Sequence, residues 1–151
     1  MNVGLVFGII FAAIVIGFLL FFGFKYVNEM FSVNCEAILG DQIMKLKDQV
    51  SKTFHLSMGS TQEFVMIVPS CVEKICFVNP EDPSSYGNWE TNNVLTRMIL
   101  VNKYNLIVFD RDKTFSGYRI DHMRTDYNFC VSSKKTLILR NDGSFVVISL
   151  P

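Results

Sequence analysis

The chain opens with an uninterrupted apolar stretch, residues 3–22, that contains no charged, amide or hydroxyl side chain. At about 1.5 Å per helical residue this stretch spans about 30 Å, the thickness of the hydrocarbon core of a bilayer. Residues 1–2 carry no basic side chain, and no small-residue cleavage site follows at residues 23–26, so a removable signal peptide fits less well. We therefore predict a retained transmembrane anchor over residues 1–24.

Polar and apolar positions alternate with a helical period after the anchor. Residues 25–35 are expected to continue as a juxtamembrane helix. In residues 41–54, Ile43, Leu46, Val50 and Phe54 fall on one face, the i, i+3, i+7, i+11 spacing of an amphipathic helix. Gly40 is a point where a continuous helix could break, and residues 58–60 are expected to end it.

From residue 61 onward the composition favours strands. Helix is expected at residues 89–101, which place Val94, Met98 and Val101 on one face, and Asn141-Asp142-Gly143 predicts a tight hairpin. Residues 36–151 are thus predicted to form one α+β domain, with the transmembrane helix continuing into an amphipathic helix packed on a mainly antiparallel sheet. The expected strands are 63–68, 72–78, 106–109, 118–122, 127–131, 136–140 and 145–150.

Four cysteines, Cys35, Cys71, Cys76 and Cys130, all lie outside the anchor, and an even number suits disulfides in an oxidising exterior. On one strand, Cys71 and Cys76 would lie about 16 Å apart, too far for a disulfide. Cys35 would then pair with one of these two and Cys130 with the other. The alternatives are four buried thiols in the cytosol, or zinc, which the lack of C-x-x-C spacing disfavours, so no metal site is expected.

Charge adds little to this picture. The chain has 14 basic and 14 acidic side chains, and the basic ones are scattered, so nucleic acid is not an expected partner. Lys25 is the basic side chain that closely follows the anchor, and it favours a cytoplasmic domain, against the cysteines. We expect an extracytoplasmic domain, because one charge is weaker evidence than four cysteines. The sequence contains no phosphate-binding loop or H-x-x-x-H zinc motif, and no cofactor is expected.

Small residues recur every four positions within the anchor: Gly4, Gly8 and Ala12, and then Ala13 and Gly17. This spacing lets two membrane helices approach closely, so the lipid bilayer and a membrane-protein partner, or further copies of the chain, are the expected partners. The alternative is that such patterns arise by chance, because glycine and alanine are common in membrane helices.

One segment carries candidate chemistry. Residues 106–115 read as an apolar strand followed by D-x-D-x-T, and they resemble the first motif of the haloacid-dehalogenase-like phosphatases. The resemblance implies Asp110 as nucleophile and Asp112 as acid and base. Lys113 replaces the usual glycine, and the 36 residues after Phe115 leave no room for the family's alternating β-α units. The alternative is a strand leading into a charged β-turn.

Asp121 and His122 could act as a general-base pair, but neighbouring residues on the expected strand point to opposite faces. We therefore assign no catalytic residue from the sequence.

Two further resemblances cover more of the chain. An apolar helix, an amphipathic continuation and an antiparallel sheet resemble the layout of type IV pilin-like proteins, although the processing site and the early glutamate of that family are missing. Cys35 after the span, with residues 59–64 and 72–77, is similar to uncharacterised single-span membrane proteins of archaea. These features predict a non-enzymatic, membrane-anchored structural or accessory subunit. The alternatives are a pilin-like filament subunit and a membrane-bound phosphatase using Asp110 and Asp112.

Overall fold

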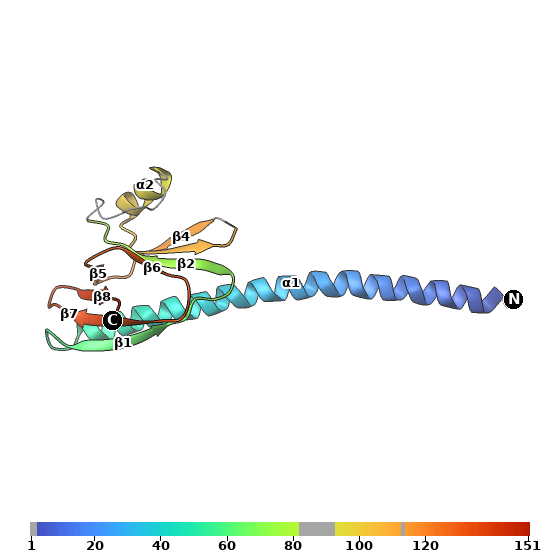
Figure 1. Cartoon of the computed structure of the whole chain (residues 1–151), viewed down its shortest axis with the longest axis horizontal. Helices are drawn as coiled ribbons and strands as arrows, with labels where there is room; N and C mark the ends of the chain where they lie inside the picture. Colours follow the sequence, from blue (N-terminus) through green and yellow to red (C-terminus); the bar gives the residue numbers. More distant parts are fainter. Residues whose placement is uncertain (1–2, 82–92, 113) are drawn as a thin grey trace. The chain divides into compact units, whose positions relative to one another are not determined.

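Helix α1 (Val3–Phe54) is the longest element of the computed structural model, which describes residues 3–81, 93–112 and 114–151. The chain divides into two units, Met1–Ala37 and Ile38–Pro151. The first unit is the N-terminal part of α1, drawn in blue in Figure 1. The second unit is an α+β domain that contains the end of α1. The helix runs through Gly40 without a break and ends at Phe54, four residues before the expected stop.

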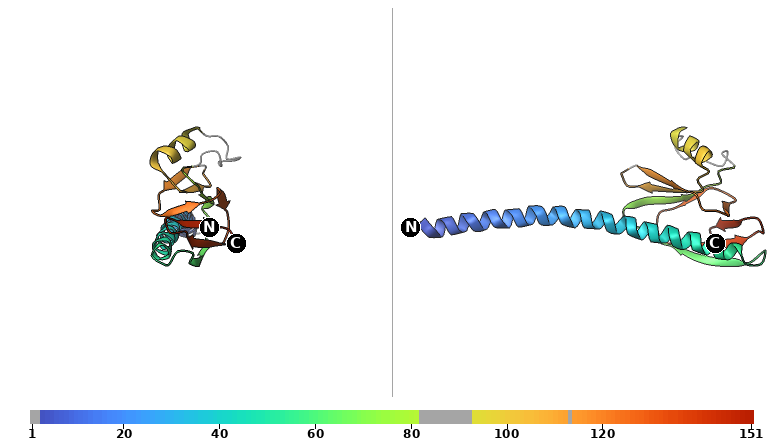
Figure 2. Two further views of the ribbon diagram at one scale, coloured as in Figure 1. Left: turned by 90° about the vertical axis from the view of Figure 1, so that its left-hand side faces the viewer. Right: turned by 180° about the vertical axis from the view of Figure 1, so that it is seen from behind.

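The second unit has two four-stranded sheets where the sequence predicted one. The first sheet has the order β1-β7-β8-β5 and the second sheet has the order β4-β3-β2-β6 (Figures 1 and 2). Neighbouring strands pair antiparallel, except that β5 and β8 pair in parallel. The strands are β1 (Thr61–Met66), β2 (Val72–Phe77), β3 (Leu106–Asp110), β4 (Phe115–Tyr118), β5 (Met123–Thr125), β6 (Phe129–Val131), β7 (Lys135–Asn141) and β8 (Val146–Ser149).

Strands and helices follow the predicted positions closely, with one error. The expected strand at residues 118–122 is wrong: β4 ends at Tyr118, a turn follows, and β5 begins at Met123. The expected helix at 89–101 corresponds to α2 (Asn93–Asn102), and its residues 89–92 lie outside the described part of the chain.

Both faces are buried in residues 106–108 of β3 and in residues 75–77 of β2, and these two stretches are continuously apolar, whereas Glu73 in the first half of β2 is exposed. Ile75 and Phe77 face the main core, whereas Cys76 between them packs with Leu95 and Ile99 of α2. Successive strand side chains point to opposite faces, so one strand serves two clusters. Helix α2 therefore covers one face of the second sheet (Figures 1 and 2).

The main core is shared by both sheets and the end of α1. Leu46 and Val50 of α1 are fully buried in it, and Ile43 and Phe54 pack against it as partly buried side chains. Strand residues from both sheets complete this cluster, including Met66, Val72, Leu106, Val108, Phe129, Val131, Leu137, Leu139, Val146 and Ile148.

Asn141, the last residue of β7, caps the C-terminus of α1. Its side-chain Nδ2 donates to the carbonyl oxygens of Thr53 (3.2 Å), Phe54 (3.0 Å) and Leu56 (2.8 Å). The last carbonyls of a helix lack partners within the helix, so these contacts satisfy groups that burial would otherwise penalise. The Asn141 side chain is itself buried.

The β7–β8 hairpin is wider than predicted. Asn141 pairs with Val146, so four residues, 142–145, form the turn, and Gly143 takes the left-handed conformation with φ 96°. The Asp142 carboxylate accepts hydrogen bonds from the backbone N–H groups of Phe145 (2.6 Å) and Ser144 (2.9 Å). The first of these is the main reason why the pKa of Asp142 lies below its ordinary value.

Gly117 on β4 allows a close contact with an aromatic ring. A Cβ atom at this position would lie 2.2 Å from Cδ2 of Tyr104, whose ring packs against the cluster under α2. At Gly40 in α1, by contrast, a Cβ atom would meet nothing within 4 Å. The two glycines therefore have different roles, although the sequence does not distinguish them.

We expect Gly117→Ala to destabilise the domain, because the added methyl group displaces the Tyr104 ring; the expected loss is about 2 kcal/mol. Gly40→Ala is the matched control, and it should raise stability by up to about 1 kcal/mol because alanine favours a helix interior. Urea unfolding of the detergent-solubilised chain measures both. Equal effects of the two substitutions would contradict the assigned contact.

Candidate functional site

All four cysteines are in disulfides. Cys76 on β2 and Cys130 on β6 are a directly opposed pair in the second sheet, with their Cα atoms 4.0 Å apart, and they form one bond. Cys35 and Cys71 are disulfide-bonded as well. Of the two arrangements that the sequence left open, the structure has the one in which Cys130 joins Cys76.

The apolar part of α1 is exposed along its length. Residues 8–26 have a mean hydropathy of 2.3 and are long enough to cross a bilayer, and none of them is buried. A Cβ atom at Gly4, Gly8 or Gly17 would meet nothing within 4 Å. At about 100° per residue, Gly4 and Gly8 lie on the opposite side of the helix from Ala13 and Gly17. The small residues thus form two separate faces.

Asp110 and Asp112 lie in and beside the β3–β4 turn of an antiparallel sheet. The Asp110 backbone N–H donates to the Thr114 carbonyl oxygen (2.9 Å), and the Thr114 hydroxyl donates to the Asp110 carboxylate (3.3 Å). This geometry is that of a charged turn, the alternative that the sequence left open. Lys113 lies outside the described residues. Among the residues described, no three histidine, cysteine or acidic side chains are grouped to hold a metal ion.

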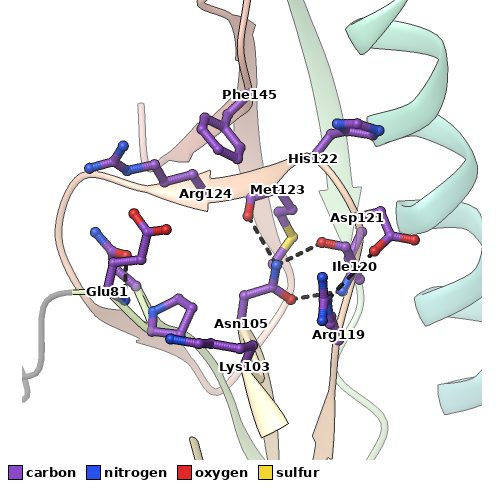
Figure 3. Close-up of a pocket in the computed structure, with 12 residues that line it drawn as sticks. Glu81, Lys103, Asn105, Arg119, Ile120, Asp121, His122, Met123, Arg124 and Phe145 are labelled. Atoms are coloured by element: carbon purple, nitrogen blue, oxygen red, sulfur yellow. Dashed lines mark hydrogen bonds and ion pairs between the residues drawn. The ribbon is translucent and has the colours of Figure 1, made fainter. Parts of the chain in front are cut away.

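A pocket of about 280 Å³ lies in the second unit, away from the two aspartates (Figure 3). It gathers the end of β2, the α2–β3 turn, the β4–β5 turn, β5 and the β7–β8 turn. Its lining residues are Asn79, Pro80, Glu81, Lys103, Asn105, Arg119, Ile120, Asp121, His122, Met123, Arg124 and Phe145.

Asn105 lines this pocket, and its side chain forms hydrogen bonds with the turn between β4 and β5. Its Nδ2 donates to the carbonyl oxygens of Ile120 (2.7 Å) and Met123 (2.9 Å), and its Oδ1 accepts from the Ile120 N–H (2.8 Å) (Figure 3). The side chain therefore supplies the bonds that a neighbouring strand would supply. The expected strand at 118–122 is replaced by a turn for this reason.

The turn also changes the expected arrangement of Asp121 and His122. His122 has a left-handed backbone, φ 61°, and its ring stacks on Phe54 at the end of α1, with the ring centroids 3.9 Å apart. Figure 3 shows the His122 ring directed toward the helix. Asp121 instead forms an exposed ion pair with Arg119 at 3.7 Å. Each of these two side chains thus contacts a partner other than its sequence neighbour.

The other pocket residues were not singled out from the sequence. Lys103, Arg124 and Phe145 lie on three segments separated by about twenty residues each, and each reads as an ordinary turn or strand residue. The one available signal was the polar residue Asn105, which immediately precedes an apolar strand and has to find buried partners.

We expect Asn105→Asp to destabilise the domain by about 2–4 kcal/mol, because the substitution removes two donors from buried carbonyl oxygens and brings a charge near them. Asn102→Asp is the control, since the Asn102 amide donates to the Met98 carbonyl oxygen at an exposed site. Chemical unfolding gives the loss of stability, and amide hydrogen exchange at Ile120 and Met123 locates it. Similar losses for both variants would argue against the assigned role.

Comparison of the chain with protein-family models, with curated proteins and with solved structures finds no match. The resemblances to pilin-like proteins and to archaeal single-span proteins therefore stay predictions from the sequence. The features of the chain that bear on its function are an exposed apolar helix, disulfides and a polar pocket.

Proposed function

We propose that the chain is a non-enzymatic structural or accessory subunit, anchored in a cell membrane by its N-terminal helix with its α+β domain outside the cytoplasm. The observation that carries the proposal is the exposed apolar segment at residues 8–26, of which no residue is buried. A predominantly apolar segment of 19 residues cannot remain in water without a large free-energy cost, and a bilayer is the environment that matches its length.

The cysteines support the external orientation. None of the four is free, and disulfides persist in oxidising compartments but are reduced in the cytosol. Cys76 is fully buried whereas Cys130 is exposed, so the bond joins the interior of the second sheet to its edge strand β6. The single Lys25 after the span is a weaker and opposite signal.

The end of α1 forms part of the folded domain. We propose that residues 41–54 act as an amphipathic helix docked on the sheets, because Leu46 and Val50 are buried, whereas Lys45 and Lys52 pair with Asp41 and Asp48 at the exposed surface. The exposed ion pairs contribute little stability, so the apolar face provides the attachment.

The small-residue faces support lateral packing in the membrane. Within the described part of the chain, a Cβ atom at Gly4, Gly8 or Gly17 would meet no side chain or other segment within 4 Å, so no contact recorded in the structure requires glycine there. Close approach of a second membrane helix is the physical use of such positions. Because the two faces lie on opposite sides, one helix could contact a neighbour on each side, as a filament or a larger complex requires.

The orientation is tested by thiol chemistry in intact cells. After reduction with a membrane-impermeant phosphine, an impermeant maleimide should label the cysteines of intact cells as fully as those of lysed cells. Alkylation before any reduction should leave all four cysteines unlabelled. Labelling that requires lysis, or free thiols in the unreduced chain, would place the domain in the cytoplasm and overturn the proposed orientation.

Lateral packing is tested within the span. We expect Gly8→Leu and Gly17→Leu each to weaken helix association in bilayers by about tenfold, because a large side chain holds the backbones apart. Ile9→Leu, a conservative change at an exposed position, is the control. Energy transfer between labelled chains in vesicles measures association. If only one of the two glycine substitutions weakens association, the helix packs through one face, as in a dimer. If neither substitution weakens association, the packing hypothesis is wrong.

A further inference from the structure

The pocket has an excess of positive charge that its own carboxylates do not neutralise. Lys103, Arg119 and Arg124 line it, together with the acidic Glu81 and Asp121. Asp121 is already paired with Arg119. Within the residues described, no carboxylate lies within ion-pair distance of Lys103 or Arg124. Lys103 thus has no carboxylate partner among the residues described, and Arg124 interacts with the Asp142 carboxylate only at longer range.

Arg124 is held in the pocket by packing rather than by an acceptor. Its guanidinium carbon lies 5.9 Å from the centre of the Phe145 ring, a cation–π contact. Its Nε atom is buried and has no hydrogen-bond partner in the described part of the chain. Because this buried Nε is closed to a ligand, a new acceptor has to meet the terminal nitrogens of the guanidinium.

The neighbouring surfaces limit the ligand to one negative charge and a small apolar body. Phe145, Met123 and Pro80 supply apolar walls beside the cations. Glu81 lines the same pocket, and its carboxylate would repel a second negative charge on the ligand. The volume of about 280 Å³ suits a ligand of a few carbon atoms or one ring.

We propose that this pocket binds a small organic carboxylate. The ligand carboxylate pairs end-on with the terminal nitrogens of Arg124, Lys103 adds a second positive charge, and the apolar body of the ligand lies against Phe145. A planar carboxylate matches the guanidinium fork in geometry as well as in charge. Asn105 takes no part in binding but holds the turn that carries Arg119 and leads into Arg124. The proposal concerns the pocket alone and does not depend on the orientation in the membrane.

The test uses the full chain in lipid nanodiscs with methyl-labelled methionine, and benzoate as the probe. Met123 lines the pocket and is buried, so its methyl NMR signal should shift with saturation as benzoate is added. The methyl signal of Met44 on α1, which is exposed and outside this pocket, reports general partitioning and should not follow the same curve. Benzylamine, with the opposite charge, should cause no saturable shift at Met123.

Substitutions assign the binding to Lys103 and Arg124. Arg124→Gln should weaken benzoate binding by about tenfold or more, because it removes a charge-assisted contact. Lys103→Gln should weaken it less, and because Lys103 is exposed this variant tests the proposal even if Arg124→Gln fails to fold. Lys134→Gln, an exposed position outside the pocket, is the control and should bind as the parent does.

Three results would overturn the proposal. They are the absence of a saturable shift at Met123, equal binding of benzylamine, and unchanged affinity in Lys103→Gln or in a folded Arg124→Gln variant. Phenyl phosphate distinguishes a site for carboxylates from a site for phosphates. Its second negative charge should weaken binding at the pocket that Glu81 lines, so binding as tight as that of benzoate would also count against a carboxylate site.

Discussion

The amide of Asn141 is the contact on which the folded unit depends most directly, because it joins three elements at one buried point. It satisfies the last carbonyl groups of α1, while its backbone bonds with Gly59 and Ser60 hold the start of β1 beside the end of β7. Its Oδ1 also accepts from Gly143 in the hairpin. The apolar face of α1 provides the burial energy, and Asn141 fixes the position at which the helix ends.

Much of the fold could be predicted because apolar periodicity depends on local sequence. The apolar runs in β2 and β3 indicate strands buried on both faces, and the helical spacing of Leu46 and Val50 indicates a helix with one buried face. Division into two sheets could not be predicted, since strand pairing between distant segments leaves no local signal. The strand expected at residues 118–122 failed because Asn105, distant in sequence, provides the competing hydrogen bonds.

The candidate sites also differ in how far the sequence alone could predict them. The disulfide arrangement could be narrowed from the sequence, because the distance between Cys71 and Cys76 on an extended chain excludes their pairing. Asp110 and Asp112 attracted attention as a motif but lie at a turn, where acidic residues are common. The pocket joins Lys103, Arg124 and Phe145 from separate segments, and only the folded chain brings them together.

The bond between Cys76 and Cys130 closes a covalent ring, because the two cysteines are separated by 54 positions. Closing a loop of this length removes conformational freedom from the unfolded chain, a stabilisation of about 4 kcal/mol in the chain-entropy description. The ring contains α2, β3, β4 and β5, and with them most of the pocket wall. A protease that cuts once inside it would leave both fragments covalently joined, so a nicked molecule would separate into two chains only after reduction.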